Sequence, residues 1–161
     1  MAEIPEEKRV YVDETGIDKY LQREHGRALR GKKVQDTKRG RKFQRTNVIG
    51  ALCDGQYLAI ETYNHTTNSE FFEAWFERVL LKELPVNHTI IMDRASFHRR
   101  NQLQSLAKQA GVNLLFLPAY SPDFNPIEQS WANLKRWLVD NLSRFRFFDF
   151  AISDYFYVSD S

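Results

Sequence analysis

The sequence predicts an α/β fold in which helices flank a mixed five-stranded sheet. Three strand patterns come first in the chain, and two further apolar strands then alternate with helical patterns. Hairpin strands that lead into strand–helix–strand crossovers are typical of a mixed sheet with helices on both faces. The length of 161 residues is enough for one buried core, so residues 1–161 are expected to form a single domain.

Strand patterns occupy the opening of the chain. Residues 9–13 are predicted to form a short strand that ends at a turn, Glu14-Thr15-Gly16. Residues 46–52 and 57–62 are predicted to form the next two strands. Asp54-Gly55 lies between them, and an Asp-Gly pair is a strong signal for a tight hairpin.

Helices and buried strands alternate through the rest of the chain. The predicted elements are a helix from residue 67 or 68 that stops before Pro85, a strand at 89–93, a helix at 99–110 closed by Gly111, a strand at 112–117, and a helix at 126–142. The order β-β-β-α-β-α-β-α is that of the ribonuclease-H-like fold. The aromatic tail is predicted to form a last helix that packs Phe150, Ile152, Tyr155 and Phe156 onto the domain.

Composition excludes several classes of protein. Hydrophobic residues make up 42% and charged residues 27% of the chain, which argues against disorder. No apolar run approaches the roughly 18 residues that a membrane helix needs, and the polar, acidic first seven residues do not resemble a secretory signal. A lone cysteine, Cys53, can form neither an intrachain disulfide nor a cysteine zinc site. A cytoplasmic protein is expected.

Basic charge is concentrated in one segment, residues 23–45, which is predicted to be a hairpin or loop insertion. The formal net charge of the whole chain is only +2. The ten basic residues of the segment are Arg23, Arg27, Arg30, Lys32, Lys33, Lys38, Arg39, Arg41, Lys42 and Arg45. Such a segment can bind a phosphate backbone, or it can be a solvated hairpin that its charge keeps soluble.

Three carboxylates fall at the ends of predicted elements. Asp13 ends the first strand, Asp93 ends the fourth, and Glu128 opens the last long helix. If the first and fourth strands are neighbours, Asp13 and Asp93 lie side by side at the carboxyl edge of the sheet, where open α/β sheets bind ligands. The helix that arrives at this edge would add Glu128.

Carboxylates that lie so close together repel one another unless cations neutralise them. Two Mg²⁺ ions, which prefer carboxylate oxygen, would remove the repulsion and assist an in-line phosphoryl displacement. Each acid also has a structural explanation: Asp13 can belong to a turn, Asp93 can cap a helix, and Glu128 can complete a capping box with Asn125. That all three reach one sheet edge by accident is much less plausible.

Three motifs resemble those of the DDE transposases, most closely the bacterial insertion-sequence branch of the mariner-like superfamily. The strongest is Leu117-Pro118-Ala119-Tyr120-Ser121-Pro122-Asp123-Phe124-Asn125-Pro126-Ile127-Glu128, followed by Trp131 and Lys135. The second is Ile91-Met92-Asp93-Arg94-Ala95-Ser96-Phe97-His98, and the first in the chain is Val12-Asp13-Glu14-Thr15-Gly16. Thirty-four residues separate Asp93 from Glu128, a spacing typical of this branch.

This resemblance implies a divalent-metal-dependent DNA nuclease and strand transferase with two Mg²⁺ (or Mn²⁺) ions. Water would cut at the transposon ends, and the freed 3′-hydroxyl would attack target DNA, usually at a TA dinucleotide. Asp13, Asp93 and Glu128 carry over as catalytic residues and metal ligands. A homo-oligomer is also implied, in a nucleoid-associated protein. The residues expected to contact DNA are Arg27, Lys32, Lys33, Arg41, Lys42, Arg94 and His98, although His98 has an equally simple role as a capping or surface residue.

Two departures from the family pattern leave alternatives open. Arg94 stands where Asn is common, so it either holds a phosphate or marks a degraded site. Nothing before Val10 can supply the helix-turn-helix domain that recognises transposon ends, so a partner chain is expected to provide it. The alternatives to a transposase are a catalytically silent DNA-binding or regulatory remnant, and a ribonuclease-H-like nuclease without strand transfer.

Overall fold

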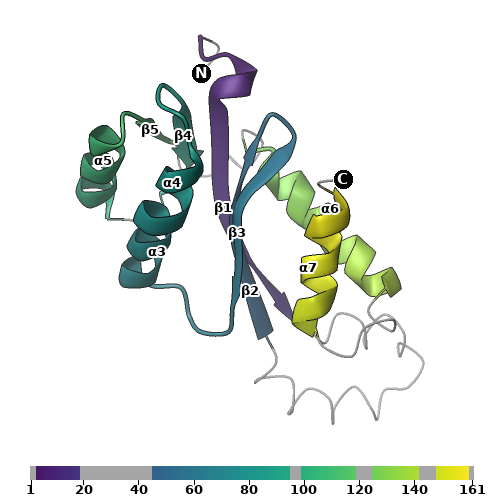
Figure 1. The fold of residues 1–161 in the computed structure, drawn as a ribbon. Coiled ribbons are helices and arrows are strands. Elements are labelled where there is room, and N and C mark those ends of the chain that lie inside the picture. Colours follow the sequence, from purple (N-terminus) through teal and green to yellow (C-terminus); the bar gives the residue numbers. More distant parts are fainter. Residues whose placement is uncertain (1–2, 19–44, 95–98, 119–124, 142–147, 160–161) are drawn as a thin grey trace. The chain divides into compact units, whose positions relative to one another are not determined.

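The computed structural model describes residues 3–18, 45–94, 99–118, 125–141 and 148–159 (Figure 1). The chain divides into two compact units. The first unit contains Met1–Asp13, Ile49–Glu61 and Thr66–Glu128. The second contains Glu14–Val48, Thr62–His65 and Gln129–Ser161.

Five strands form one sheet in the order β3-β2-β1-β4-β5. Their bounds are β1 Arg9–Asp18, β2 Arg45–Cys53, β3 Gln56–Tyr63, β4 Thr89–Met92 and β5 Asn113–Phe116. β4 runs parallel to both β1 and β5. β2 and β3 are joined by only two residues, a link short enough only for antiparallel strands, so the sheet is mixed as predicted.

The turn between β2 and β3 has the backbone geometry that its sequence predicts. Asp54 has a φ of 51° and Gly55 a φ of 80°, so both residues are left-handed, as a type I′ turn requires. The Asp-Gly hairpin signal is therefore confirmed.

β1 is longer than predicted. The expected turn at Glu14-Thr15-Gly16 is wrong, because the strand continues through these residues to Asp18. Ile17, beyond the expected turn, is only 1% exposed. Burial of this side chain and pairing within the sheet outweigh the local turn preference of a single glycine. Asp13 consequently lies in the middle of β1 and not at its end.

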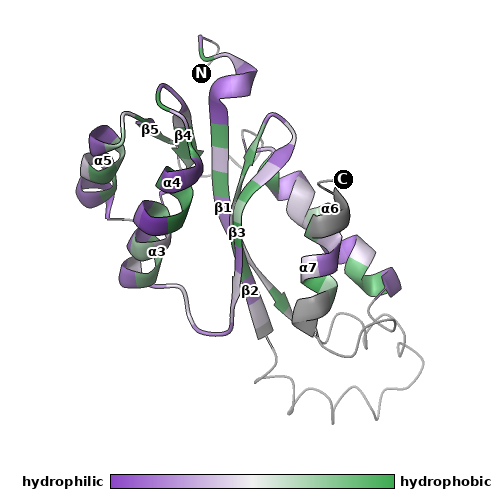
Figure 2. Cartoon of the chain, viewed as in Figure 1, coloured by the Kyte–Doolittle hydropathy of each residue, from purple (hydrophilic) through white to green (hydrophobic). Residues whose placement is uncertain are grey.

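In the first unit, one predicted helix becomes three consecutive segments, α3 Ser69–Trp75, a π-helical η3 Phe76–Leu80 and α4 Leu81–Glu83. Asn68 caps the start, since its side-chain oxygen accepts a hydrogen bond from the Phe71 amide at 2.8 Å. The apolar face buries Phe72, Trp75, Phe76 and Leu80. In Figure 2, α3 and α4 each carry both hydrophilic residues, coloured purple, and hydrophobic residues, coloured green.

Trp75 connects α3 to the edge strand β3. Its indole nitrogen donates a buried hydrogen bond of 2.8 Å to the carbonyl of Ala59. Ala59 has a φ of 55°, a left-handed conformation that is irregular for a residue within a strand. The bond satisfies the carbonyl at this irregular position.

The helix α5, Arg100–Gln109, lies between β4 and β5 in the sequence and buries Leu103 and Ala107. Gly111 follows it with a φ of 74°, the left-handed residue that ends a helix. The predicted helix and its glycine cap are confirmed. A short 3-10 turn, η1 Glu6–Lys8, precedes β1 in the same unit.

Aromatic pairs join the two helices whose residues make up much of the second unit, α6 Ile127–Asn141 and α7 Phe148–Ser159. The ring centroids of Trp131 and Phe156 lie 6.4 Å apart, edge to face, and those of Trp137 and Tyr155 lie 5.4 Å apart. Ile152 and Phe156 are buried, which confirms the predicted packing role of the aromatic tail at these positions. The Phe150 side chain lies outside the described part of the structure.

Of the helices in the described ranges, none combines the length and the hydrophobicity that a bilayer-spanning segment needs.

Candidate active site beside β1 and β4

Asp13 and Asp93 are brought together by the pairing of two neighbouring parallel strands. Tyr11 on β1 is level with Ile91 on β4. Continued two residues along each chain segment, the same register would bring Asp13 level with Asp93, which lies just beyond the last residue of β4. Adjacent strands lie about 4.8 Å apart, and side chains two residues apart share a face. Asp13 is 9% exposed and Asp93 is exposed.

Asn125 attaches the start of α6 to β1. Its side-chain amide donates to the carbonyl of Val12 at 3.5 Å, and its side-chain oxygen accepts from the Ile127 amide at 3.2 Å. The backbone carbonyl of Asn125 also accepts from the amide of Glu128 at 3.1 Å. A buried side chain thus links the residue before Asp13 to the first turn of the helix that carries Glu128. Sequence reasoning treated Asn125 only as a helix cap and missed this link.

Asp13, Asp93 and Glu128 all belong to the first unit, and their oxygen ligands are the kind that hard divalent cations prefer. The side chains themselves are not gathered around one point: within the described ranges, no three His, Cys, Asp or Glu side chains form a group that could hold a metal. Asp93 and Glu128 are exposed, so both can change rotamer without disturbing the core.

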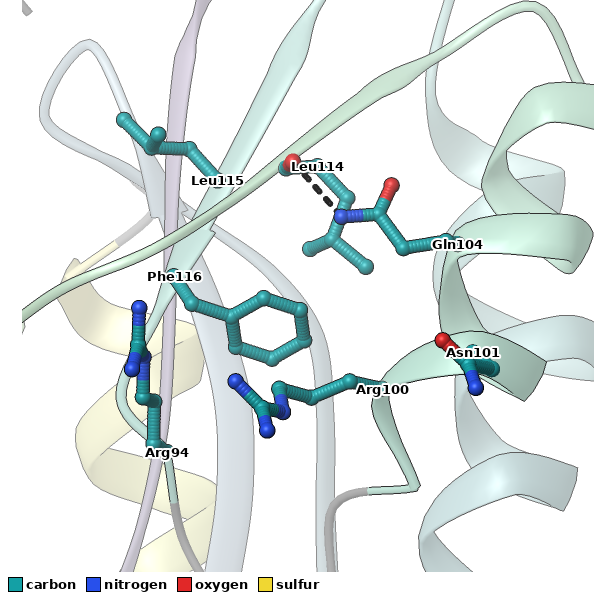
Figure 3. A pocket seen from close by; sticks show the side chains of 7 residues that line it. All are labelled: Arg94, Arg100, Asn101, Gln104, Leu114, Leu115 and Phe116. Atoms are coloured by element: carbon teal, nitrogen blue, oxygen red, sulfur yellow. Dashed lines mark hydrogen bonds between the residues drawn. The ribbon is translucent and has the colours of Figure 1, made fainter.

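Arg94 follows Asp93 directly and lines an open pocket of about 720 Å³. Figure 3 shows that Arg100 and Asn101 of α5 and Phe116 of β5 line the same pocket. Sequence reasoning identified Arg94 but not Arg100 or Phe116. The strand order could have suggested them, because β5 lies beside β4.

An ion pair holds the beginning of α5 to α3. Arg99 donates two hydrogen bonds to the carboxylate of Glu73, at 2.5 and 2.8 Å. The hydrogen bond and charge of Glu73 raise the pKa of Arg99 above its usual value. Arg99 therefore keeps its charge and its geometry at the entrance to α5.

The other predicted DNA-contacting residues lie outside the described residues. Arg27, Lys32, Lys33, Arg41 and Lys42 fall within residues 19–44, and His98 falls within residues 95–98.

Cys53 is not suited to nucleophilic catalysis. Its thiol donates to the carbonyl of Glu7 at 3.4 Å. Burial, and secondarily the negative charge of Asp54, raise the pKa of this thiol above its usual value. The reactive thiolate form is therefore disfavoured, which agrees with the expectation that the chemistry depends on carboxylates.

Comparison with protein families gives one match that spans most of the chain. The family described as DDE superfamily endonuclease matches residues 8–149. These residues include all three candidate carboxylates.

A curated relative is similar over part of the chain. It is the Transposable element Tc3 transposase of Caenorhabditis elegans, 33% identical over 93 residues. The matched stretch covers 55% of this chain but only 28% of that transposase.

Solved structures share the fold. One is a chain of the simian T-cell lymphotropic virus intasome in complex with PP2A regulatory subunit B56 gamma. It has a TM-score of 0.64 and 12% identity, over 96% of this chain and 48% of that one. Another is the catalytic core domain of BIV integrase, with a TM-score of 0.56 and 13% identity, over 91% of this chain and 79% of that one. The predicted ribonuclease-H-like fold is confirmed.

Proposed function

We propose, from the premise that the chain belongs to the DDE superfamily endonucleases, that it is the catalytic domain of a DNA transposase. Its reaction would be cleavage at transposon ends, followed by transfer of the cut strand into target DNA. Transposase and integrase catalytic domains are what the chain resembles in sequence and in fold.

The observation that carries the proposal is the backbone arrangement of the three acids. The β1–β4 register brings Asp13 level with Asp93, and the hydrogen bonds of Asn125 tie the first turn of α6 to the residue before Asp13. Were their side chains to turn toward one another, the three carboxylates would repel, and bound divalent cations would offset that repulsion and assist phosphoryl transfer.

Divalent metal ions are the general requirement of this family, and we propose that Asp13, Asp93 and Glu128 hold two Mg²⁺ or Mn²⁺ ions. When bound, such ions supply charge neutralisation at the scissile phosphate and activation of the attacking oxygen. Asp13 is the best fixed of the three acids, since it lies within a strand and is nearly buried. Asp93 and Glu128 would complete the site by turning their exposed side chains toward it.

The proposed partners are the two kinds of DNA that transposition joins, transposon ends and target DNA, the latter usually cut at TA. Because the matched stretch covers 28% of the Tc3 transposase, a helix-turn-helix region that recognises the ends would belong to another part of a longer protein or to a separate subunit. Paired ends further suggest a homo-oligomer, working on DNA in the nucleoid. Residues 1–161 would act as a single catalytic domain within that assembly.

An end-cleavage and joining assay tests the proposed function. Purified protein is incubated with labelled transposon-end DNA and a target plasmid, with Mg²⁺, with Mn²⁺ or with chelator. Metal-dependent cutting followed by covalent joining to the plasmid is the expected result. Cutting without joining would indicate a nuclease, and binding without cutting would indicate a silent remnant. Either result would overturn the transposase assignment.

We also propose that the basic segment 23–45 contacts the DNA backbone. Replacing Lys32, Lys33, Arg41 and Lys42 with Ala is expected to weaken binding to duplex DNA and to flatten its salt dependence. Each lost phosphate contact lowers the slope of log K against log salt by about 0.9. Fluorescence anisotropy over a series of salt concentrations measures both quantities.

A matched variant controls for the loss of four charges. Lys8, Arg78, Lys82 and Arg136 are exposed, and their joint replacement with Ala removes the same net charge elsewhere on the chain. An unchanged salt slope in the first variant, or an equal fall in both, would refute the contact.

A further inference from the structure

The stretch from Arg94 to Pro122 contains no Asp or Glu. Its Lys and Arg residues are Arg94, Arg99, Arg100 and Lys108, so it carries a formal charge of +4 while the whole chain carries +2. Both α5 and β5 lie within this stretch. The net positive charge of this stretch favours the binding of anions.

Two of these cations face one pocket. Arg99 is engaged by Glu73, but within the described residues neither Arg94 nor Arg100 takes part in an ion pair. Figure 3 shows Arg100 reaching from α5 across the pocket toward Arg94 and the ring of Phe116. Two exposed arginines that line one hollow can both donate hydrogen bonds to an anion such as a phosphate.

The same pocket offers an aromatic surface and carboxamides. Phe116 is half-buried, so part of its ring is open to a ligand. Gln104 donates from its side-chain nitrogen to the carbonyl of Leu114 at 3.3 Å, which fixes its amide at the pocket wall and leaves its oxygen to accept. Asn101 is exposed on the first turn of α5. Proteins commonly bind nucleobases by stacking an aromatic ring on the base and by hydrogen bonds from amide side chains to its edge.

A second hollow of about 680 Å³ adjoins the first, since Gln104 and Leu114 line both. Ser105, Lys108 and Asn113 also line it. Together the two hollows form the α5–β5 groove, which follows edge strand β5 with Arg94 and Arg100 at one end and Lys108 at the other. Among its described lining residues there is no carboxylate.

We propose that the α5–β5 groove binds an unpaired segment of a DNA strand, with a base against Phe116 and a phosphate between Arg94 and Arg100. The inference rests on the proposed function, because Arg94 is adjacent to Asp93 and a strand in the groove would lead directly to the candidate active site. A duplex keeps its bases stacked on one another, so only an unpaired base can lie on the Phe116 ring. The groove therefore serves the part of the DNA that is opened beside the scissile phosphate.

Binding of a short, fluorescently labelled oligothymidylate to the full chain tests this proposal. Anisotropy is measured in chelator, so that metal-dependent chemistry makes no contribution. Arg100→Ala is expected to weaken binding about tenfold or more and to lower the salt slope by about 0.7. Phe116→Ala is expected to weaken binding about five- to 100-fold with an unchanged salt slope, because stacking involves no counterion release. Phe116→Trp should restore affinity.

Arg78→Ala is the matched control, because Arg78 is an exposed arginine of the same unit outside this groove. Arg100 is exposed, so its replacement leaves the core intact even if Phe116→Ala impairs folding. Wild-type affinity in Arg100→Ala would overturn the proposal, as would an equal loss in Arg78→Ala or stronger binding of the matching duplex.

Binding of the oligothymidylate in the groove can be tested independently of the proposed cleavage and joining reaction. Asp93→Asn should bind the oligothymidylate at least as tightly as the wild type, because it removes a negative charge beside Arg94. Absence of end cleavage by the wild-type chain, with groove binding retained, would reject only the transposase assignment. Retained cleavage with normal binding by Arg100→Ala would reject only the groove.

Discussion

Replacing Asp93 with Asn is expected to reduce metal-dependent DNA cleavage by at least about 10³-fold, because one fixed charge that stabilises the reacting phosphate through bound metal is lost. The substitution keeps the size of the side chain, and Asp93 is exposed, so the fold should be unaffected. Single-turnover cleavage of labelled end DNA in Mn²⁺ measures the effect. Thermal melting verifies that the variant is folded.

Asp140→Asn supplies the control for this loss of charge. Asp140 is exposed on α6, and the same substitution there should leave the cleavage rate within about twofold of the wild type. Cleavage by Asp93→Asn at more than a tenth of the wild-type rate would contradict its assignment as a metal ligand. The alignment of Asp93 with Asp13 would then be a consequence of strand pairing alone and would not indicate an active site.

The second large effect is expected at Asn125, which we infer to be a positioning residue. Asn125→Ala removes both side-chain hydrogen bonds, the one to the Val12 carbonyl and the one from the Ile127 amide. Residues that orient a metal ligand typically contribute 10- to 100-fold to activity or metal affinity. A fall of this size in kcat is expected, with KM for DNA nearly unchanged and a higher metal concentration needed for half-maximal activity.

The metal concentration needed for half-maximal activity distinguishes a positioning role of Asn125 from a simple contribution to stability. Asn125 is buried, so the variant should also lose about 1–3 kcal/mol of unfolding free energy. Assays well below the melting temperature remove that contribution. Asn133→Ala is the control, since Asn133 is an exposed asparagine of the same helix that accepts hydrogen bonds from Gln129 and Arg136. A wild-type metal requirement in Asn125→Ala would show that the residue is only structural.

Local sequence signals predicted most of the fold. The Asp54-Gly55 turn and Gly111 at the end of α5 depend on backbone preferences of one or two residues, and both are confirmed. The helix start predicted at residue 67 or 68 agrees with α3, which Asn68 caps. The strand at 89–93 was predicted from its run of apolar residues, and every residue of β4 is buried. The predicted order of the elements is confirmed, and the structure shows that β1 lies beside β4.

Features that depend on distant contacts were not predicted. The turn preference of Glu14-Thr15-Gly16 gave way to the burial of Ile17, and the π-helical turn at Phe76–Leu80 has no local signal. For the candidate site, the sequence could nominate Asp13, Asp93 and Glu128 from their positions at the ends of predicted elements, although β1 continues past Asp13. It could not predict that Asn125 reaches across 113 residues of chain to Val12.

The irregular edges of the sheet have a consequence for how copies of this chain assemble. An open edge invites another strand to add to it, which leads to aggregation, and short or interrupted edges resist this. β5 has only four residues, and Gln104 already occupies the carbonyl of Leu114. On the opposite edge, β3 is distorted at left-handed Ala59, whose carbonyl accepts a hydrogen bond from Trp75. Sheet extension is therefore a poor route to a multimer, and any self-association should use helices or loops instead.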